Sequence, residues 1–306
     1  MTHSIQADQG WRVWWQLTRP HTLTASFAPV FLGTMIALDQ SSSIDWLLFL
    51  AMLVASLLIQ AATNMFNEYY DFARGLDNEK SVGIGGAIVR NGVKPKTVLT
   101  LALMLYVIAG IIGIWICSQT SWWLLLVGGI AMSIGYLYTG GPYPIAYTPF
   151  GELFSGVVMG YLIVIIAFFI QTGEVTTTAS LLAVPSTLLV AAIMLTNNIR
   201  DMVGDAASGR KTLAILVGRP TAVNILLAFF ALSYLWVLVL VVMGAVTPWT
   251  LLVFLSAPKA VKVVKTFKRY TEPLEVMPAM KATGITNTLF AFLLGIGLLV
   301  HHLFTL

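Results

Sequence analysis

The sequence predicts an all-α membrane protein, a polytopic helical bundle of about nine transmembrane helices in a single domain over residues 1–306. Of the 306 residues, 58% are hydrophobic and only 10% are charged. Soluble domains of ordinary composition carry about 25% charged residues. Apolar stretches of about 20 residues, the length that crosses ~30 Å of hydrocarbon, also recur along the whole chain. Together these observations exclude an ordinary soluble protein.

Nine windows meet this length criterion. The expected spans fall at 22–38, 46–66, 97–117, 121–138, 152–171, 180–199, 221–243, 246–264 and 284–304. The first is short, and Pro258, Lys259 and Lys262 are expected to interrupt the end of the eighth. Spans seven and nine carry no ionisable residue at mid-depth, so they are interpreted as scaffold.

The distribution of positive charge predicts the orientation. All 17 Lys and Arg residues lie in the N-terminal segment or at and after the ends of spans two, six and eight. By the positive-inside rule, the N-terminus and the even-numbered loops are cytoplasmic, and the His301–His302 end lies outside. The chain is therefore expected in the plasma (inner) membrane. Its net charge of +4 indicates a basic face toward anionic lipid or an anionic substrate, with no nucleic-acid partner and no obligate protein partner evident.

Two features near the start of the spans have simple interpretations. Residues 11–19 hold three Trp and two Arg, which predicts an interfacial helix on the cytoplasmic boundary. Arg19 is either an anchor to lipid phosphate or part of a binding site, and its position leaves both open. Cys117, the sole cysteine, cannot form an internal disulfide and is interpreted as a small core residue.

The chemically richest stretch is residues 64–77, where two amides and three carboxylates follow a long apolar segment. Charge at such a place is costly unless something pairs with it. Steps of three and four residues place a set of oxygen ligands on one helix face: Asn64, Asn67, Glu68 and Asp71. Asp77 follows after Gly75, which permits a turn. Such a cluster suits Mg²⁺, which takes one or two carboxylates together with phosphate oxygens. The simpler alternative is a solvated helix end.

The loop after this motif is long and basic. With the motif it forms the segment 64–96, and it carries Arg90, Lys94 and Lys96. Loops of about 20 residues without obvious structure are usually functional lids or disordered. Cations beside carboxylates indicate an anion held between metal and protein. The Gly run at 83–86 is not a phosphate-binding P-loop, because no Gly-Lys-Ser/Thr follows it.

A Tyr-rich loop, residues 136–152, follows the fourth span and contains no Lys or Arg. Tyr147 is interpreted either as an interfacial anchor or as an aromatic face for a cation. The same loop contains Tyr138 and Tyr143.

The second half repeats the logic of the first motif in the segment 197–213. Asn197, Asp201 and Asp205 follow at steps of four and share one helix face, and Asn198 and Arg200 are expected to point elsewhere. A Gly turn and the cations Arg210 and Lys211 come next. The repetition indicates a diverged internal duplication, with two carboxylate sets holding two or more Mg²⁺ around one diphosphate.

The last basic region, the expected loop 259–281, carries cations that are interpreted as facing lipid or setting the orientation. The constellation as a whole predicts a cytoplasmic-side site with hydrophobic walls. Such a site suits a substrate with a diphosphate head and a long apolar tail.

These residues resemble a known family. Two segments are similar to the paired Asp-rich motifs of the UbiA superfamily of intramembrane prenyltransferases. The first contains Asn67, Asp71 and Asp77, and the second contains Asn197, Asp201 and Asp205. Within that superfamily, the start of the first span at 19–23, the loop 138–152 and the segment 209–213 resemble the MenA branch, the 1,4-dihydroxy-2-naphthoate polyprenyltransferases.

The resemblance implies transfer of a polyprenyl group from its diphosphate to dihydroxynaphthoate, with loss of the ring carboxylate, to form demethylmenaquinone. It implies that a set of oxygen ligands holds Mg²⁺ and diphosphate: Asn67, Asp71, Asn197, Asp201 and Asp205. Arg90 and Lys211 would contact the diphosphate or the naphthoate carboxylate. Tyr138 and Tyr143 would stabilise the allylic cation or position the acceptor. Glu68 stands where many relatives have Asp, so it ranks below Asp71 as a ligand.

Three alternatives remain open. Another aromatic acceptor, such as 4-hydroxybenzoate, fits the same motifs. Membrane CDP-alcohol phosphotransferases also use Asp clusters and Mg²⁺, but their continuous signature is absent here. A cation-coupled transporter could use paired Asn and Asp residues, although such sites usually lie near the middle of the membrane.

Overall fold

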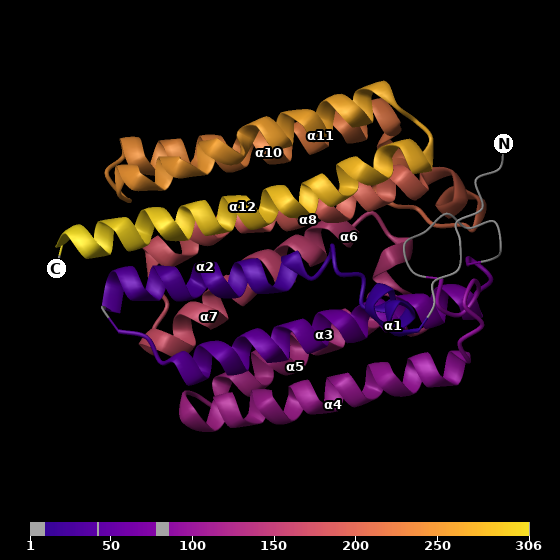
Figure 1. The fold of residues 1–306 in the computed structure, drawn as a ribbon, viewed down its shortest axis with the longest axis horizontal. Coiled ribbons are helices and arrows are strands. Elements are labelled where there is room, and N and C mark those ends of the chain that lie inside the picture. Colours follow the sequence, from indigo (N-terminus) through magenta and orange to yellow (C-terminus); the bar gives the residue numbers. More distant parts are fainter. Residues whose placement is uncertain (1–9, 42, 78–85, 306) are drawn as a thin grey trace.

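The computed structural model describes residues 10–41, 43–77 and 86–305, and every regular element in these ranges is helical. The long helices lie side by side along one direction, with the first described helix, Trp11–Leu17, toward one end of the bundle and the C-terminal end of the last, Pro273–Thr305, at the other (Figure 1). The prediction of an all-α bundle is therefore confirmed.

The first half of the chain supplies helices α1 to α5, at Trp11–Leu17, Thr24–Ser41, Trp46–Ala73, Pro95–Gln119 and Trp123–Leu137. After a short 3₁₀ turn at Ile145–Tyr147, one continuous helical rod follows as α6 (Gly151–Ser155), the π-helical segment η2 (Gly156–Leu162) and α7 (Ile163–Thr172). The second half adds α8 to α12, at Thr177–Ala207, Leu213–Val217, Arg219–Val242, Ala257–Arg269 and Pro273–Thr305, with the 3₁₀ segment η3 (Pro248–Ser256) before α11.

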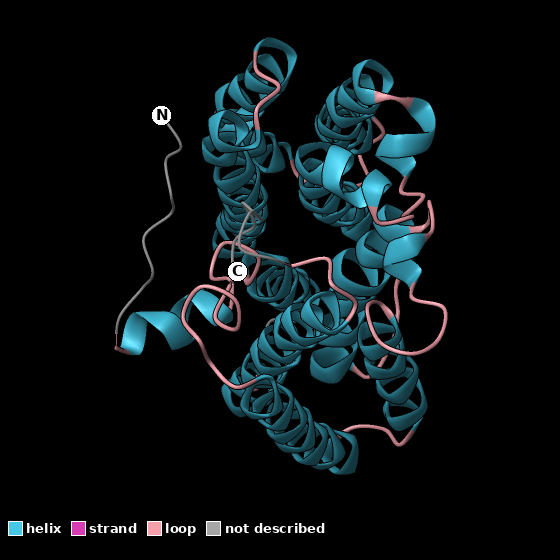
Figure 2. Ribbon diagram, turned by 90° about the vertical axis from the view of Figure 1, so that its right-hand side faces the viewer, coloured by secondary structure: helices cyan, strands magenta, loops and turns pink. Residues whose placement is uncertain are grey.

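Figure 2 looks along the bundle, so that the helices are seen nearly end on. Helix α2 packs against α3, α7 and α12, and α8 packs against α10, α12 and the π-helical segment. The largest core cluster joins α2, α7 and α8 to the C-terminal helices. The two motif-bearing helices, α3 and α8, are thus built into one continuous bundle.

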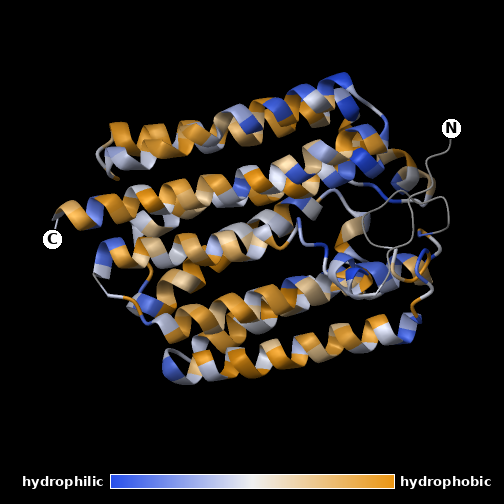
Figure 3. Cartoon of the chain, viewed as in Figure 1, coloured by the Kyte–Doolittle hydropathy of each residue, from blue (hydrophilic) through white to orange (hydrophobic). Residues whose placement is uncertain are grey.

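Six helices in the described ranges are long and apolar enough to cross a membrane, and Trp123–Leu137 is a shorter apolar helix. Apolar residues cover the middle of the rods and polar residues gather toward the ends (Figure 3). These observations confirm a multi-pass membrane fold. The count of nine spans and the side on which the N-terminus lies stay predictions.

The expected loop 259–281 is largely helical, so this prediction was wrong. Helix α11 buries Ala260, Val263, Val264 and Phe267 on one face and leaves its five cations exposed. The apolar residues follow helical spacing, but the Lys residues between them make the segment polar on average, which favoured a loop. Pro258 does not interrupt the helix, because it lies in the first turn, where a missing N–H costs nothing.

Close helix contact at Gly33 makes a stability test possible. A Cβ added there would lie 2.3 Å from the Val164 carbonyl oxygen on α7, whereas one at Gly128 would meet nothing within 4 Å. We expect Gly33→Ala to destabilise the protein by about 1–3 kcal/mol through overpacking. Gly128→Ala, the matched control, should be neutral or slightly stabilising, because Ala favours helix. Thermal unfolding in detergent measures both, and equal melting temperatures would contradict this packing.

Helices α3 and α8 end in the same way. Gly75 follows the last turn of α3 with φ 74°, and Gly209 follows α8 with φ 82°, a left-handed conformation that Gly adopts without penalty. The turn expected at Gly75 is confirmed. Because each turn reverses the chain directly after a carboxylate-bearing helix end, the loops fold back over those carboxylates.

Candidate active site

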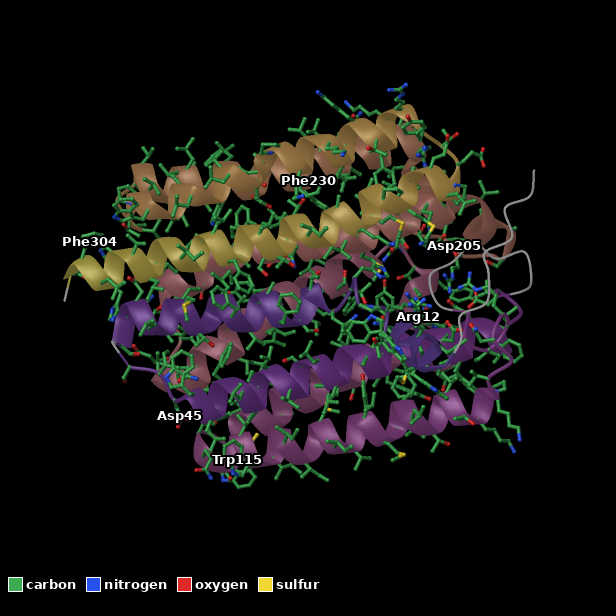
Figure 4. The ribbon with its side chains drawn as sticks, viewed as in Figure 1. Arg12, Asp45, Trp115, Asp205, Phe230 and Phe304 are labelled. Carbon is green, nitrogen blue, oxygen red and sulfur yellow. The ribbon has the colours of Figure 1, made fainter. Side chains whose placement is uncertain are left out.

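The two Asp-rich motifs line a single cavity of about 450 Å³. The polar part of the cavity lies at the end of the bundle that holds Asp205 and Arg12 (Figure 4). Asp45 and Phe304 lie at the opposite end. Most of the residues predicted from the sequence line this cavity: Arg19, Asn64, Asn67, Glu68, Asp71, Asp77, Arg90, Tyr138, Asn197, Asp201 and Asp205. The predicted pairing of two distant motifs at one place is therefore seen directly.

Arg210 links the two motifs. Its Nη2 lies 2.5 Å from Oδ1 of Asp71 on α3, and its Nη1 lies 2.9 Å from Oδ1 of Asp205 on α8. Both carboxylates are buried, with 8% and 7% of their surface exposed. Although burial lowers the pKa of Arg210, the carboxylates of Asp71 and Asp205 outweigh it and raise the pKa. The two motif carboxylates thus converge on one cationic group.

This convergence fits a divalent cation. Within the described ranges, no three Asp, Glu, His or Cys side chains form a complete protein-only metal site. Mg²⁺ does not need one, because it binds through one or two carboxylates and completes its shell with phosphate oxygens and water. Asp71 and Asp205 supply two carboxylates from separate helices, and the amides of Asn67 and Asn197 line the same cavity. The donor set is the hard, oxygen-rich type that Mg²⁺ prefers.

The second motif presents more residues to the cavity than its spacing predicts. Asn198 and Arg200 were expected to point elsewhere, and this was wrong, because both line the cavity. Arg200 donates from Nε to Oδ1 of Asp201 at 2.6 Å and from Nη2 to its second carboxylate oxygen. The cavity wraps around α8, so residues on more than one face of this helix reach it.

Asn64 contacts the chain around Arg19. Its Nδ2 donates to the Thr18 carbonyl oxygen at 2.7 Å and to the Thr22 hydroxyl at 2.9 Å. Arg19, between them, has φ 50°, the one left-handed non-glycine residue in the described part of the chain. Of the two interpretations left open for Arg19, a place in the site is favoured, since the residue lines the cavity.

Glu68 holds the loop after the first motif. It is 1% exposed, and its Oε1 accepts hydrogen bonds from the backbone N–H groups of Gly86 at 2.8 Å and Ile88 at 3.3 Å. Its Oε2 lies 3.6 Å from Nη2 of Arg19. With one oxygen bound to the backbone, Glu68 is less free to bind metal than Asp71. Residues 78–85, the middle of the predicted lid, lie outside the described residues.

Tyr147 lies beneath two arginines. The Cζ atoms of Arg74 and Arg210 lie 5.7 Å and 5.2 Å from its ring centroid. Arg74 also donates from Nη2 to the Gly141 carbonyl oxygen at 2.9 Å, and from Nη1 to that of Thr139. The interpretation of Tyr147 as an aromatic face for a cation is supported, and Arg74 joins the first motif to the Tyr-rich loop.

Two titratable groups at the polar end have shifted pKa values. Burial raises the pKa of Asp77 to about 6, and the nearby Asp71 carboxylate acts in the same direction. Burial lowers the pKa of His21 to about 4, assisted by the charge of Arg19. At pH 7 Asp77 is therefore mainly ionised and His21 is neutral. His21 also lines the cavity, although its sequence position beside Pro20 gave no signal of a site.

Two predicted site residues lie away from the cavity. Tyr143 is 91% exposed on the loop after α5. The Lys211 side chain is also exposed, and its backbone N–H donates to the Tyr147 carbonyl oxygen at 3.1 Å. Neither lines the cavity. The cation beside the motif carboxylates is therefore Arg210, the residue before Lys211.

The cavity continues from its polar end into an apolar region between α3, α4, α5 and the α6–α7 rod. Along α3 its lining runs from Asp71 back to Met52, and on α4 it includes Ile116 and Cys117. At 1.5 Å per residue, the α3 lining extends over about 28 Å, close to the thickness of the hydrocarbon core. A charged head and a long apolar tail could therefore be held by one continuous surface.

Comparison with known proteins agrees with this architecture. The UbiA prenyltransferase family matches residues 26–285. The 1,4-dihydroxy-2-naphthoate octaprenyltransferase of Bacillus subtilis (strain 168) is 58% identical over 297 residues, covering 97% of this chain and 95% of that protein.

Two solved structures share the fold. A UbiA homolog from Aeropyrum pernix K1 superimposes with a TM-score of 0.67 at 18% identity, covering 92% of this chain and 98% of that one. A UbiA homolog from Archaeoglobus fulgidus bound to GPP and Mg²⁺ gives a TM-score of 0.65 at 17% identity, covering 94% and 99%. From the extent of the family match and the identity to its relatives, this chain belongs to the UbiA prenyltransferase family.

Proposed function

We propose that this protein transfers a polyprenyl group from polyprenyl diphosphate to 1,4-dihydroxy-2-naphthoate, with release of diphosphate and of the ring carboxylate as CO₂, to give the naphthoquinol form of demethylmenaquinone. The observation that carries the proposal is the convergence of Asp71 and Asp205, from two separate motifs, at the polar end of a cavity with long apolar walls. The identity to the Bacillus subtilis enzyme over nearly the whole chain supports the choice of acceptor.

In this reaction the carboxylates and amides of both motifs would hold Mg²⁺ and, through it, the diphosphate end of the substrate. Asp71, Asp201 and Asp205 supply charge, and Asn67 and Asn197 supply neutral oxygens. When bound there, Mg²⁺ would neutralise charge on the leaving diphosphate. The A. fulgidus homolog, which binds Mg²⁺ together with GPP, supports this assignment.

The arginines at the polar end bind the same anion. Arg210, Arg19 and Arg90 line the cavity beside the carboxylates, where they can donate to phosphate oxygens. The apolar walls exclude water from the carbon that is transferred, so that the prenyl cation meets the acceptor ring and not water. Tyr138, which also lines the cavity, adds an aromatic face that can stabilise this cation.

The protein acts as a multi-pass membrane enzyme, and the site faces the cytoplasm of the plasma membrane. The placement of all Lys and Arg residues supports that side. The transporter alternative is disfavoured, because Asp71 and Asp205 lie in the last turns of α3 and α8 and not near mid-membrane.

The deciding experiment offers the purified protein polyprenyl diphosphate and Mg²⁺, with dihydroxynaphthoate and 4-hydroxybenzoate as competing acceptors. We expect a prenylated, decarboxylated naphthoquinol as the main product, lost on adding EDTA and restored by excess Mg²⁺. Product from hydroxybenzoate alone would move the enzyme to another pathway within the family. Unchanged product in EDTA would contradict the role given to the metal.

A further inference from the structure

A second polar cluster lies beside the cavity, away from the Asp71–Arg210–Asp205 bridge. Glu152 on α6 is 3% exposed, and its Oε1 accepts a hydrogen bond from Nδ2 of Asn198 on α8 at 2.9 Å. Its Oε2 is buried with no hydrogen-bond partner in the described part of the chain. A carboxyl group buried among apolar helices is costly, so this one requires an explanation.

The helix packing that brings these residues together is unusual. Directly after α6 the rod becomes π-helical over Gly156–Leu162, a rare geometry that is frequent at functional sites. A Cβ at Gly156 would lie 2.7 Å from the Thr187 carbonyl oxygen, and one at Gly160 would lie 2.6 Å from that of Ser186. The missing side chains let the rod lie directly on α8, which holds Glu152 opposite Asn198.

Tyr138 completes the cluster. A Cβ on Gly151 would lie 2.7 Å from the Tyr138 hydroxyl and 3.9 Å from Nδ2 of Asn198. The hydroxyl and the amide thus both lie within 4 Å of the position that a Gly151 Cβ would take, and a larger residue there would displace them. Tyr138 and Asn198 both line the cavity, whereas Glu152 does not.

The hydrogen bond with Glu152 determines what Asn198 offers to a ligand. A carboxyl oxygen without a proton can only accept, so the amide must turn its NH₂ group toward Glu152. The group that remains for the cavity is Oδ1, an acceptor. Beside it the Tyr138 hydroxyl can both donate and accept. Such a pair recognises a hydroxyl group on a ligand.

We infer that Asn198 and Tyr138 bind a ring hydroxyl of the aromatic acceptor, and that Glu152 is a positioning residue that orients the Asn198 amide. This inference rests on the proposed function, since it concerns the acceptor of the same reaction. Asn198 precedes Asp205 by seven residues, about 10 Å along α8. The ring hydroxyl thus lies deeper than the Asp71–Arg210–Asp205 bridge, on the side where the apolar tail begins.

The test compares acceptors that differ by one hydroxyl. Full-length protein in nanodiscs is titrated with 1,4-dihydroxy-2-naphthoate, 1-hydroxy-2-naphthoate and 4-hydroxy-2-naphthoate, and polyprenyl diphosphate binding with Mg²⁺ is measured on the same samples. The wild type should bind the compound that lacks the recognised hydroxyl about tenfold more weakly, the usual size of one hydrogen bond. Asn198→Leu should remove that preference and leave diphosphate affinity within twofold, which also shows that the variant is folded.

Glu152 is tested by a conservative and a disruptive change. Glu152→Gln keeps an oxygen that can accept from the Asn198 amide, so we expect the preference to stay within about threefold of the wild type. Glu152→Leu removes that oxygen and should lose the preference as Asn198→Leu does. Asn224→Leu and Glu275→Leu make the same exchanges at exposed positions on α10 and α12, and they should change nothing.

The outcomes separate this inference from the proposed function. Equal weakening of all three naphthoates by Asn198→Leu, or a parallel loss of diphosphate binding, would overturn the hydroxyl site. So would a wild type that binds all three alike. If the wild type binds no naphthoate but retains diphosphate binding, the proposed acceptor is wrong. The hydroxyl site is then tested by comparing the affinities for 4-hydroxybenzoate and benzoate in the wild type and in Asn198→Leu.

Discussion

Asp71→Asn is expected to reduce prenyl transfer by about 100- to 1000-fold, the usual cost of removing one electrostatic contact to the charge that develops in a transition state. The substitution keeps the shape of the side chain and removes its charge. Asp71 loses its ion pair with Arg210, and the cavity loses one of its buried motif carboxylates. The measurement is the initial rate with saturating polyprenyl diphosphate and Mg²⁺, together with the Mg²⁺ concentration for half-maximal rate, which should rise.

The chain offers a matched control for this prediction. Asp39 also contacts a basic side chain, with its Oδ1 2.8 Å from Nδ1 of His301, but it lies at the other end of the bundle. Asp39→Asn should leave the rate within about twofold. Lys265→Ala, on the exposed face of α11, should be equally harmless. A loss from either control as large as that from Asp71→Asn would show that the site is misplaced.

Arg210→Gln is expected to be nearly as harmful, with a loss of about 100-fold, whereas the neighbouring Lys211→Gln should stay within threefold. Removing Arg210 leaves Asp71 and Asp205 as buried carboxylates that repel each other, and it removes a donor for the anion. Breaking a buried ion pair in this way typically costs about 3–5 kcal/mol of stability. Without added ligand the variant should therefore also melt earlier than the wild type.

A ligand titration separates the two effects of Arg210→Gln. Mg²⁺ supplies the positive charge that the carboxylates have lost, so it should restore much of the melting temperature without restoring the rate. A rate that recovers with the melting temperature would mean that Arg210 acts on stability alone. If Lys211→Gln caused the larger loss of activity, Lys211 and not Arg210 would be the cation that binds the substrate anion, as the sequence predicts.

Much of the architecture could be predicted from the sequence, because its signals are long and regular. Apolar windows predict membrane helices, and steps of three and four residues place Asn67, Asp71, Asn197 and Asp201 on shared faces. The repetition of the motif predicts that both sets meet. All four of these residues line one cavity, as expected.

The errors have a common physical cause, which is that tertiary packing decides what a helix face touches. Periodicity separates Asn198 and Arg200 from Asn197 and Asp201, but the cavity curves around α8 and reaches all four. Likewise, no local pattern distinguishes Arg210 from Lys211. Which of two neighbouring cations turns inward depends on the left-handed turn at Gly209 and on the Tyr147 ring, which comes from a distant loop.

The ends of α3 and α8 have an electrostatic consequence for the order in which ligands bind. Asp71 and Asp205 lie in the last turns of their helices, where the dipole of each helix adds a negative potential. Two helix ends and several carboxylates repel a free diphosphate and attract a divalent cation. Cation and anion must therefore raise each other's affinity, and by thermodynamic reciprocity they do so by the same factor. The empty enzyme is in this way selective for the metal complex of its substrate over the bare anion.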